Sequence, residues 1–408
     1  KEISNENINL IKNCFIENKI TNIFTNNISM NNKFFDNFMK MFNNEFNIIK
    51  FISNQATSFA NDGFSRIHTS NYSCMITSNI NEVPYFISGL GESFMDNTRN
   101  LIIIIEKDKV INLDLILDSL SKKVISINKE TLLNNSFINL FNETVNHLKN
   151  GIPKPVILKI DYDILIDNKL NQEYDKIIFK NTNYSLNKQI KESIVNDINC
   201  CKNMMLYIGN GCVDADKEIF NFVNKTNCLV STTFSAKGIF PEDHANWFWC
   251  GVSSGVPNEL LCLLDKVDLL IIVGNKMGEL STGHFRIDSF KKVYYIDIDN
   301  DNFNNNYDSI NLKMDANIFF KELNNTTLYS KNNLIDENTI IHSNINKKEL
   351  QFNSNKILPY KLVRKIQSIF PDNTIYSCDS GNSTLVSIEC LRLKNKKCFI
   401  GPIDYSSM

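Results

Sequence analysis

The polar run at residues 379–383 carries groups that could bind an anionic ligand. Its sequence, Asp-Ser-Gly-Asn-Ser, stands between a predicted strand at residues 374–378 and a predicted helix that runs to Leu391. Ligands of open parallel sheets gather at the carboxyl ends of the strands, where the free amides of a helix N-terminus attract anions. The run is therefore either part of a ligand site or an ordinary turn, and its spacing does not decide between the two.

Other residues of chemical interest give weaker signals. Residues 209–211, Gly-Asn-Gly, also join a predicted strand to a predicted helix and could cradle a phosphate, but they lack the GxGxxG spacing of dinucleotide sites, which favours a plain tight turn. The five histidines are far apart and form no nucleophile-base pattern, so we expect surface or capping roles. The eleven cysteines include no CxxC pair and have no histidine at metal-ligand spacing, which argues against zinc.

The composition is that of an ordinary globular protein. The 408 residues are 43% hydrophobic and 22% charged, and the formal net charge of −2 gives no general reason to expect nucleic acid or an acidic membrane as a partner. Because the N-terminus has no basic region followed by an apolar run, and no apolar stretch has membrane-spanning length, we predict a cytoplasmic protein. The sequence starts at Lys1 without Met and stops at Met408 just after a strand-like run, which suggests a fragment.

Short β-rich runs alternate with helical patterns along the chain, which is typical of parallel sheets covered by helices. In the first unit the predicted strands are residues 20–25, 46–51, 74–77, 101–105, 124–127 and 155–160, and the predicted helices are residues 34–42, 55–67, 84–94 and 137–148. In the second unit the predicted strands are residues 204–208, 228–232, 269–273 and 292–297, and the predicted helices are one that ends at Cys201 and residues 214–224 and 258–264. A third unit opens with a predicted helix at residues 360–370.

These patterns predict an α/β fold with three doubly wound parallel-sheet domains, the third truncated by the end of the sequence. The expected domains are residues 1–165, 186–325 and 357–408. Residues 326–356 are rich in Asn, Lys and Ser with few aromatics, so we predict an exposed linker there.

Residues 54–66, Asn-Gln-Ala-Thr-Ser-Phe-Ala-Asn-Asp-Gly-Phe-Ser-Arg, resemble a helix of the thiamine-diphosphate enzymes of the pyruvate decarboxylase and acetolactate synthase superfamily. In that family the helix begins with the Glu that activates the cofactor and ends in Asp-Gly-Tyr-Ala-Arg. Residues 79–83 and 89–94 resemble the decarboxylase Gly-Val-Gly-Glu-Leu turn and its helix. Three further runs resemble the family's central domain: residues 236–244, 267–274 and 281–285. The resemblance covers essentially the whole chain, and it makes the three predicted domains pyrimidine-binding, central and diphosphate-binding in that order.

The resemblance implies thiamine diphosphate and Mg²⁺ as cofactors. It assigns cofactor contacts to six residues: Ile80 at the pyrimidine ring, Gly381, Asn382 and Ser383 at the diphosphate, Ser406 through its carbonyl at the aminopyrimidine, and Met408 as the wedge that bends the cofactor. The family's magnesium motif, Gly-Asp-Gly followed by Asn, would lie beyond Met408. The family builds its site between two subunits, which implies a homodimer or tetramer that acts on a small-molecule 2-oxo acid.

Three acid-base positions depart from the decarboxylase pattern. Asn54 stands at the position of the activating Glu, and Ser29 stands where decarboxylases carry an Asp acid. The decarboxylase His-His pair after the fourth strand has no counterpart, because residues 106–109 run on as Glu-Lys-Asp-Lys. An amide can hydrogen-bond to the pyrimidine but cannot exchange a proton with it, and such acid-base contributions are about 10²–10⁴-fold in rate. We therefore expect Asn54 to impair activation of the cofactor.

The resemblance implies non-oxidative decarboxylation of a pyruvate-like 2-oxo acid through a carbanion at C2 of the thiazolium. The turn that contains Glu82 and the Thr282-Gly283 loop favour this decarboxylase interpretation. The missing His pair fits the alternative, an acetolactate synthase-like carboligase. An alternative of another class is a catalytically inactive paralogue that acts as an assembly partner. The sequence does not determine the substrate, or whether the central domain binds a nucleotide such as FAD.

Overall fold

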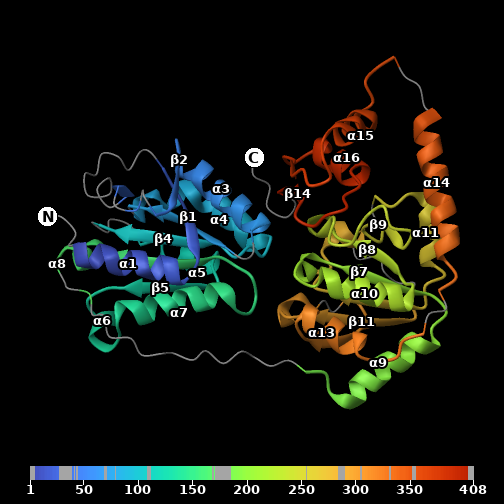
Figure 1. Cartoon of the computed structure of the whole chain (residues 1–408), viewed down its shortest axis with the longest axis horizontal. Helices are drawn as coiled ribbons and strands as arrows, with labels where there is room; N and C mark the ends of the chain where they lie inside the picture. The colour runs from blue at the N-terminus through green and yellow to red at the C-terminus, as the bar shows by residue number, and fades with distance from the viewer. Residues whose placement is uncertain are drawn as a thin grey trace. The chain divides into compact units, whose positions relative to one another are not determined.

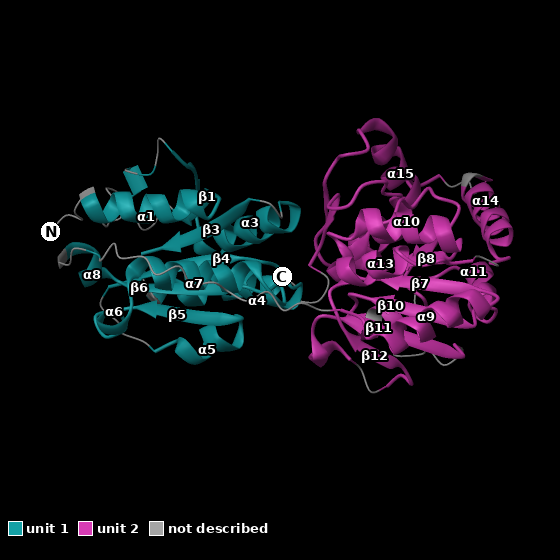
Figure 2. Cartoon of the chain, turned by 60° about the horizontal axis from the view of Figure 1, so that its bottom comes forward, with its two compact units in different colours: residues 1–181, 404–408 teal, residues 182–403 magenta. Residues whose placement is uncertain are grey.

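The computed structural model divides the chain into two compact α/β units, shown in different colours in Figure 2. Unit 1 is built from Lys1–Asn181 and unit 2 from Thr182–Ile403, and each is described separately. The structure describes residues 5–26, 39–40, 42, 45–68, 71–78, 80–107, 112–167, 170, 185–253, 255–283, 290–303, 306–329, 332–351 and 355–402. Among these residues, no helix is long and apolar enough to cross a membrane.

Unit 1 is a six-stranded parallel sheet with helices on both faces (Figure 1). In sheet order the strands are β2 (Asn47–Phe51), β1 (Ile20–Asn26), β3 (Tyr72–Thr77), β4 (Leu101–Glu106), β6 (Val156–Asp161) and β5 (Lys123–Ile127). The helices are α1 (Asn5–Glu17), α3 (Asn54–Ile67), η2 (Ile80–Glu82), α4 (Val83–Met95), α5 (Asp114–Ser119), α6 (Thr131–Asn134), α7 (Phe137–Lys149) and α8 (Tyr162–Asp167). In β4, Ile103 and Ile105 face a core under α1 and α7, whereas Ile102 and Ile104 face a second core under α4. Burial on both faces explains why this strand is a continuous apolar run.

The order of strands in unit 1 creates a switch point between β1 and β3. The chain leaves β1 toward β2 on one side and returns as β3 on the other side. Helix α3 follows β2, and η2 follows β3, so both begin at the carboxyl edge of the sheet. Open parallel sheets bind their ligands at such a point.

Unit 2 contains a second six-stranded parallel sheet (Figure 1). In sheet order its strands are β12 (Ile310–Lys313), β11 (Lys292–Asp297), β10 (Leu269–Val273), β7 (Met204–Ile208), β8 (Leu229–Thr232) and β9 (Trp247–Cys250). The helices around it are α9 (Lys188–Cys200), η3 (Asn210–Cys212), α10 (Asp216–Thr226), η4 (Phe234–Ala236), α11 (Asn258–Leu264), α12 (Glu279–Thr282), η5 (Asn300–Asn302), α13 (Ala316–Asn324) and α14 (Ile335–Gln351). One core surrounds the whole sheet.

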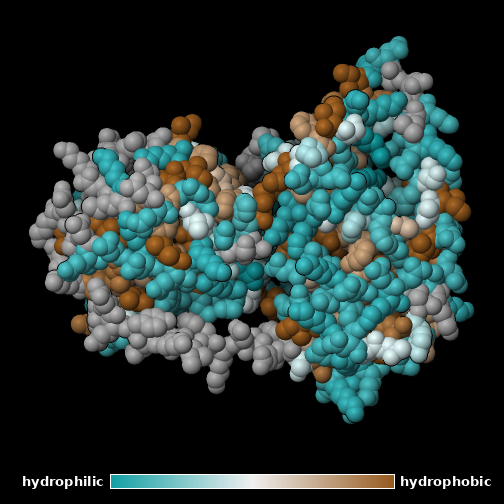
Figure 3. Space-filling view, in the orientation of Figure 1, coloured by the Kyte–Doolittle hydropathy of each residue, from teal (hydrophilic) through white to brown (hydrophobic). Residues whose placement is uncertain are grey.

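The residues expected to open a third domain lie within unit 2. They form α15 (Pro359–Ile369), α16 (Asn382–Cys390) and a two-stranded parallel sheet of β13 (Tyr376–Ser377) and β14 (Phe399–Ile400). Leu391 and Leu393 belong to the same core as the central sheet. Helix α15 leaves an apolar stripe exposed, and Figure 3 shows hydrophobic side chains gathered on this part of unit 2.

Most predicted strands are confirmed, and the differences have physical causes. The edge strands β9 and β12 and the helices α1, α5, α6, α8, α12 and α13 were not predicted; all of them except α1 have nine residues or fewer. Residues 335–351 of the expected exposed linker form helix α14, in which Asn338 is 1% exposed. Its amide donates to the carbonyls of Ala245 (3.0 Å) and Trp247 (2.9 Å), so polar contacts hold this helix on the sheet edge together with Ile335, Ile341 and Ile345, which pack against the core. The predicted helix at residues 34–42 falls mostly outside the described residues.

Candidate active site

Asn54 is the first residue of α3 and lies at the carboxyl edge of the unit 1 sheet. Ser53 caps the helix, because its hydroxyl accepts a hydrogen bond from the Ala56 backbone N–H at 3.1 Å. The Thr57 hydroxyl donates to the Ser53 carbonyl at 2.7 Å, which fixes the same first turn. The cap therefore ends the extended chain after β2 and holds Asn54 in a buried position, 5% exposed.

A carboxylate lies next to this amide. Asn54 Nδ2 donates to Glu82 Oε2 at 3.2 Å, and the Thr77 hydroxyl at the end of β3 donates to the same oxygen. Glu82 is partly buried and ends η2. The elements that follow β2 and β3, the two strands on either side of β1, thus meet at the switch point through one hydrogen-bonded trio.

Within the described part of the chain, two buried polar atoms at this edge have no hydrogen-bond partner. They are Asn54 Oδ1 and the hydroxyl oxygen of Thr25, which is 1% exposed near the end of β1. A buried acceptor without a partner costs about 1–3 kcal/mol, so native proteins keep few of them. Their position at the switch point, where ligands bind, indicates a polar ligand that completes these hydrogen bonds.

Asp62 and Arg66, in the second half of α3, connect this helix to α4. The Arg66 guanidinium pairs with Asp62 (2.7 Å), Glu92 (2.7 Å) and Asp96, and all four side chains are largely buried. Burial raises the pKa of Glu92 to about 7; Arg66 opposes this shift, and the nearby carboxylate of Asp96 adds to it. The cluster fixes α3 against α4, and it thereby sets where Asn54 and Glu82 meet.

Gly89 allows these two helices to approach closely. A Cβ added at Gly89 would stand 2.2 Å from Ser58 Oγ on α3. The glycine is therefore a packing requirement, and Ser58 is itself buried with its hydroxyl bonded to the Gln55 carbonyl at 2.8 Å.

The residues predicted to contact a diphosphate lie together in unit 2. Gly381, Asn382 and Ser383 are exposed at the start of α16, and Gly381 has a φ of +117° with nothing within 4 Å of an added Cβ. No side chain caps this nine-residue helix. The first amides of the helix are thus open to an anion, as the strand-turn-helix pattern predicted.

Comparison with known proteins agrees with these features. Residues 192–323 match the family model described as "Thiamine pyrophosphate enzyme, central domain". The probable acetolactate synthase large subunit of Methanococcus aeolicus is 25% identical over 293 residues, which covers 64% of this chain and 48% of that protein. The acetolactate synthase large subunit of Corynebacterium glutamicum is 29% identical over 162 residues, 36% of this chain and 24% of that protein.

These matches support membership of the thiamine-diphosphate-dependent enzyme superfamily. A third relative, the chloroplastic acetolactate synthase 2 of Nicotiana tabacum, is 31% identical over 117 residues, 28% of this chain and 17% of that protein. The chain thus spans between 17% and 48% of the length of these three relatives. Membership implies thiamine diphosphate with a divalent metal, so the cofactor prediction is confirmed at the level of the family.

The described residues fit this cofactor. An aminopyrimidine carries N–H donors, and the orphan Asn54 oxygen and Thr25 hydroxyl are partners of the required kind. A diphosphate needs several amide donors, which the open start of α16 supplies at residues 381–383.

Several predicted site residues lie outside the described part of the chain. They are Ser29, Ser406, Met408 and the side chain of Ile80, of which only the backbone is described, in η2. The end of the loop at residues 281–285 is also outside it. Within the described ranges, no group of three or more His, Cys, Asp or Glu could hold a metal ion.

The thiamine-diphosphate motifs in unit 2 serve packing. Lys237 and Glu242 form a fully buried ion pair at 2.8 Å, and Lys237 Nζ also donates to the carbonyls of Ile388 (2.9 Å) and Leu391 (3.2 Å). A Cβ at Gly238, which has φ +78°, would stand 2.1 Å from the Asn395 carbonyl oxygen. The run at residues 236–244 therefore joins the chain after α16 to the central sheet.

The Gly209 turn is likewise structural. Its amides are already used, because Gly209 N–H donates to the Val273 carbonyl (2.9 Å) and Gly211 N–H to the Gly274 carbonyl (3.0 Å). An added Cβ at Gly209 would stand 2.2 Å from that Gly274 oxygen. This supports a plain tight turn over a phosphate cradle.

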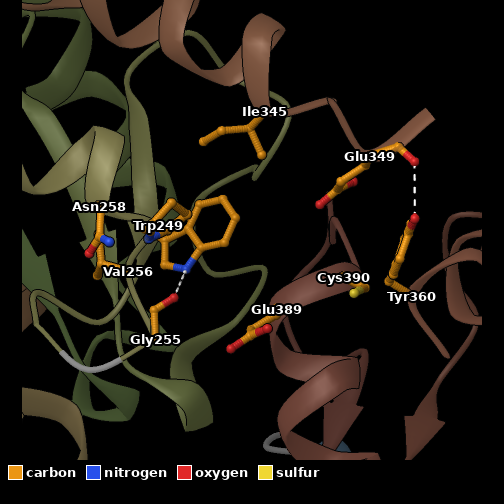
Figure 4. A pocket seen from close by; sticks show the side chains of 10 residues that line it. Trp249, Gly255, Val256, Asn258, Ile345, Glu349, Tyr360, Glu389 and Cys390 are labelled. Atoms are coloured by element: carbon orange, nitrogen blue, oxygen red, sulfur yellow. Dashed lines mark hydrogen bonds between the residues drawn. The ribbon is translucent and has the colours of Figure 1, made fainter. Parts of the chain in front are cut away.

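A pocket of about 420 Å³ in unit 2 is separate from these motifs (Figure 4). Two hydrogen bonds join its lining residues: the Trp249 indole N–H donates to the Gly255 carbonyl at 2.9 Å, and the Tyr360 hydroxyl donates to the Glu349 carbonyl at 3.1 Å. This contrasts with the switch point of unit 1, where two buried acceptors have no partner.

Sequence reasoning identified Asn54 but missed its partners. The sequence pattern places Glu82 only in a turn, and it predicts no site role for Thr25 or Thr77. The available signal was positional, since all of them follow or end strands that the predicted parallel sheet brings to one edge.

Proposed function

We propose that this chain belongs to a carboligase of the acetolactate synthase kind, which joins two small 2-oxo acids with loss of CO₂. The observation that supports this proposal is the match to the Methanococcus aeolicus protein. It covers 64% of the chain, which is more than either unit contains, so the likeness extends over both units. The names of the relatives favour this carboligase over the decarboxylase interpretation.

Bound thiamine diphosphate supplies the carbon nucleophile and the electron sink for such a reaction. Asn54 would bind the pyrimidine and the open amides at residues 381–383 would bind a diphosphate, each as the contribution of its own unit. A simple decarboxylase must also protonate its product. At the end of β4, where decarboxylases carry their His pair, Glu106 is instead paired with Lys159 at 3.2 Å. A second oxo acid can take the place of that proton, which favours carbon-carbon bond formation.

The test is the product ratio of the full-length protein with thiamine diphosphate, Mg²⁺ and pyruvate. We expect one acetolactate, measured as acetoin after acid treatment, for each CO₂ released. Acetaldehyde in equal amount to CO₂ would instead establish a decarboxylase. Cofactor binding without any product would support the inactive paralogue, a reading that Asn54 favours because an amide exchanges no proton.

The contact between Asn54 and Glu82 determines which variants would test the inactive-paralogue hypothesis. In Asn54→Glu a second carboxylate would face Glu82 at hydrogen-bond distance, and neighbouring carboxylates raise one another's pKa. The double variant Asn54→Glu/Glu82→Gln provides a single carboxylate with a neutral partner. If only the variants with Glu at position 54 turn over, the wild-type chain is a paralogue without catalysis. We further propose a homodimer or tetramer, since thiamine-diphosphate enzymes are generally oligomeric.

A further inference from the structure

We infer that Glu82 is a positioning residue, which turns the Asn54 amide so that its oxygen faces the ligand and accepts a hydrogen bond from a ring N–H. This inference rests on the proposed function for the identity of the ligand, the aminopyrimidine of thiamine diphosphate. It does not rest on it for the orientation of Asn54.

The orientation follows from what each group can donate. A carboxylate only accepts hydrogen bonds, and the amide of Asn54 has one donor end and one acceptor end. With Nδ2 toward Glu82, the 3.2 Å contact is a hydrogen bond. With the amide turned over, two oxygens would face each other without a proton between them. Glu82 therefore selects the first orientation.

Thr77 strengthens this selection. Its hydroxyl donates to the same Oε2 atom that accepts from Asn54, so the carboxylate is held from β3 while it holds the amide on α3. Both side chains next to Glu82 are buried, at 0% exposure for Thr77 and 5% for Asn54. The trio is therefore a built arrangement rather than a chance contact on the surface.

The remaining end of the amide points to the ligand chemistry. Asn54 Oδ1 is buried and has no hydrogen-bond donor among the residues that the structure describes. A bare ring nitrogen is an acceptor and cannot meet it, whereas a ring nitrogen that carries hydrogen can. The negative charge of Glu82 acts in the same direction, because a carboxylate within about 4–6 Å shifts a neighbouring equilibrium toward the proton-bearing form by about 10- to 1,000-fold.

The activating carboxylate is thus absent from position 54 but present one hydrogen bond farther out. A neutral side chain at position 54 and a charged one at position 82 together favour the N–H form of the pyrimidine. Asn54 transfers no proton itself.

The test uses full-length protein, Mg²⁺ and thiamine diphosphate labelled with ¹⁵N in the pyrimidine ring. In wild type we expect the bound ring nitrogen to show the NMR shift of a nitrogen that carries hydrogen. In Glu82→Gln, where the amide at 54 is free to turn, we expect that signal to be lost and calorimetric affinity to fall tenfold or more. Glu130→Gln, a matched change at an exposed residue, should leave both unchanged. Equal signals in wild type and Glu82→Gln would overturn the inference.

A measurement without cofactor separates this inference from the proposed function. In protein labelled with ¹⁵N-asparagine, the side-chain amide signal of Asn54, assigned by its absence in Asn54→Ala, should respond to Glu82: its chemical shift should differ between wild type and Glu82→Gln and should be the same in wild type and Glu130→Gln. If wild type binds no cofactor but the Asn54 amide signal changes in Glu82→Gln, the proposed function fails and the positioning role stands. An amide that does not respond to Glu82 refutes the positioning role.

Discussion

The Arg66 cluster predicts that unit 1 loses stability as the pH rises toward neutrality. Burial raises the pKa of Glu92 from 4.5 to about 7. A carboxyl group with a higher pKa in the folded than in the unfolded state binds its proton more tightly when folded. Its stabilising contribution is therefore fully present below about pH 4.5 and is lost as the pH rises through about 7. The shift corresponds to about 3 kcal/mol.

Hydrogen exchange of peptides from α3 and α4, measured in the full chain between pH 5 and 8 and corrected for intrinsic rates, reports this free energy. Fluorescence would not, because Trp247 and Trp249 both lie in unit 2. In Glu92→Gln, the protection of α3 and α4 should decline less with rising pH, whereas in Glu130→Gln it should decline as in wild type. Protection that rises with pH in wild type, or an equal decline in Glu92→Gln, would refute the raised pKa of Glu92 in the folded chain.

Three further predictions concern packing and charge. Lys237→Met leaves Glu242 buried without its cation, so the free energy of unfolding of unit 2 should fall by about 3–5 kcal/mol, measured by urea unfolding followed by tryptophan fluorescence. The double variant with Glu242→Leu should recover most of this loss. An unchanged free energy of unfolding in the single variant would contradict the buried pair. Gly89→Ala should lower the stability of unit 1 by about 1–3 kcal/mol through overpacking. Gly63→Ala should raise it by up to about 1 kcal/mol, because nothing lies within 4 Å of an added Cβ there. Equal hydrogen-exchange protection of α3 in the two variants would count against the close contact at Gly89. Burial lowers the pKa of His342 to about 4. Its contribution to the stability of unit 2, about 2–3 kcal/mol, is therefore present above pH 6.5 and is lost as the pH falls. The difference in urea midpoint between wild type and His342→Gln should accordingly grow from pH 4 to 7.

The sheets could be predicted because their strands are buried on both faces. Residues 101–105 and 269–273 are continuous apolar runs, and the structure makes both of them central strands. The edge strand β12 has three exposed residues in four, so no such run identifies it. Helix α14 has few apolar residues, and the contact of Asn338 with the edge strand β9 is invisible in a pattern of hydrophobicity.

The candidate site was predictable only in part. Asn54 was identified by its place in a helix that resembles the family pattern, but its link to Glu82, 28 residues away, depends on which strands are neighbours. In the same way, the contact between Lys237 and the carbonyl of Ile388 joins residues 151 positions apart. Periodicity describes single elements, whereas these contacts arise from the order in which the elements pack.

The central claim is that this chain contributes to a thiamine-diphosphate site at the carboxyl edge of unit 1. Calorimetric titration of the full-length protein with thiamine diphosphate, at saturating Mg²⁺, tests it most directly. We predict saturable binding at one site per subunit that is weakened at least tenfold in Asn54→Leu, which removes the hydrogen bond and keeps the size of the side chain. No binding by wild type, or equal binding by Asn54→Leu, would contradict the account.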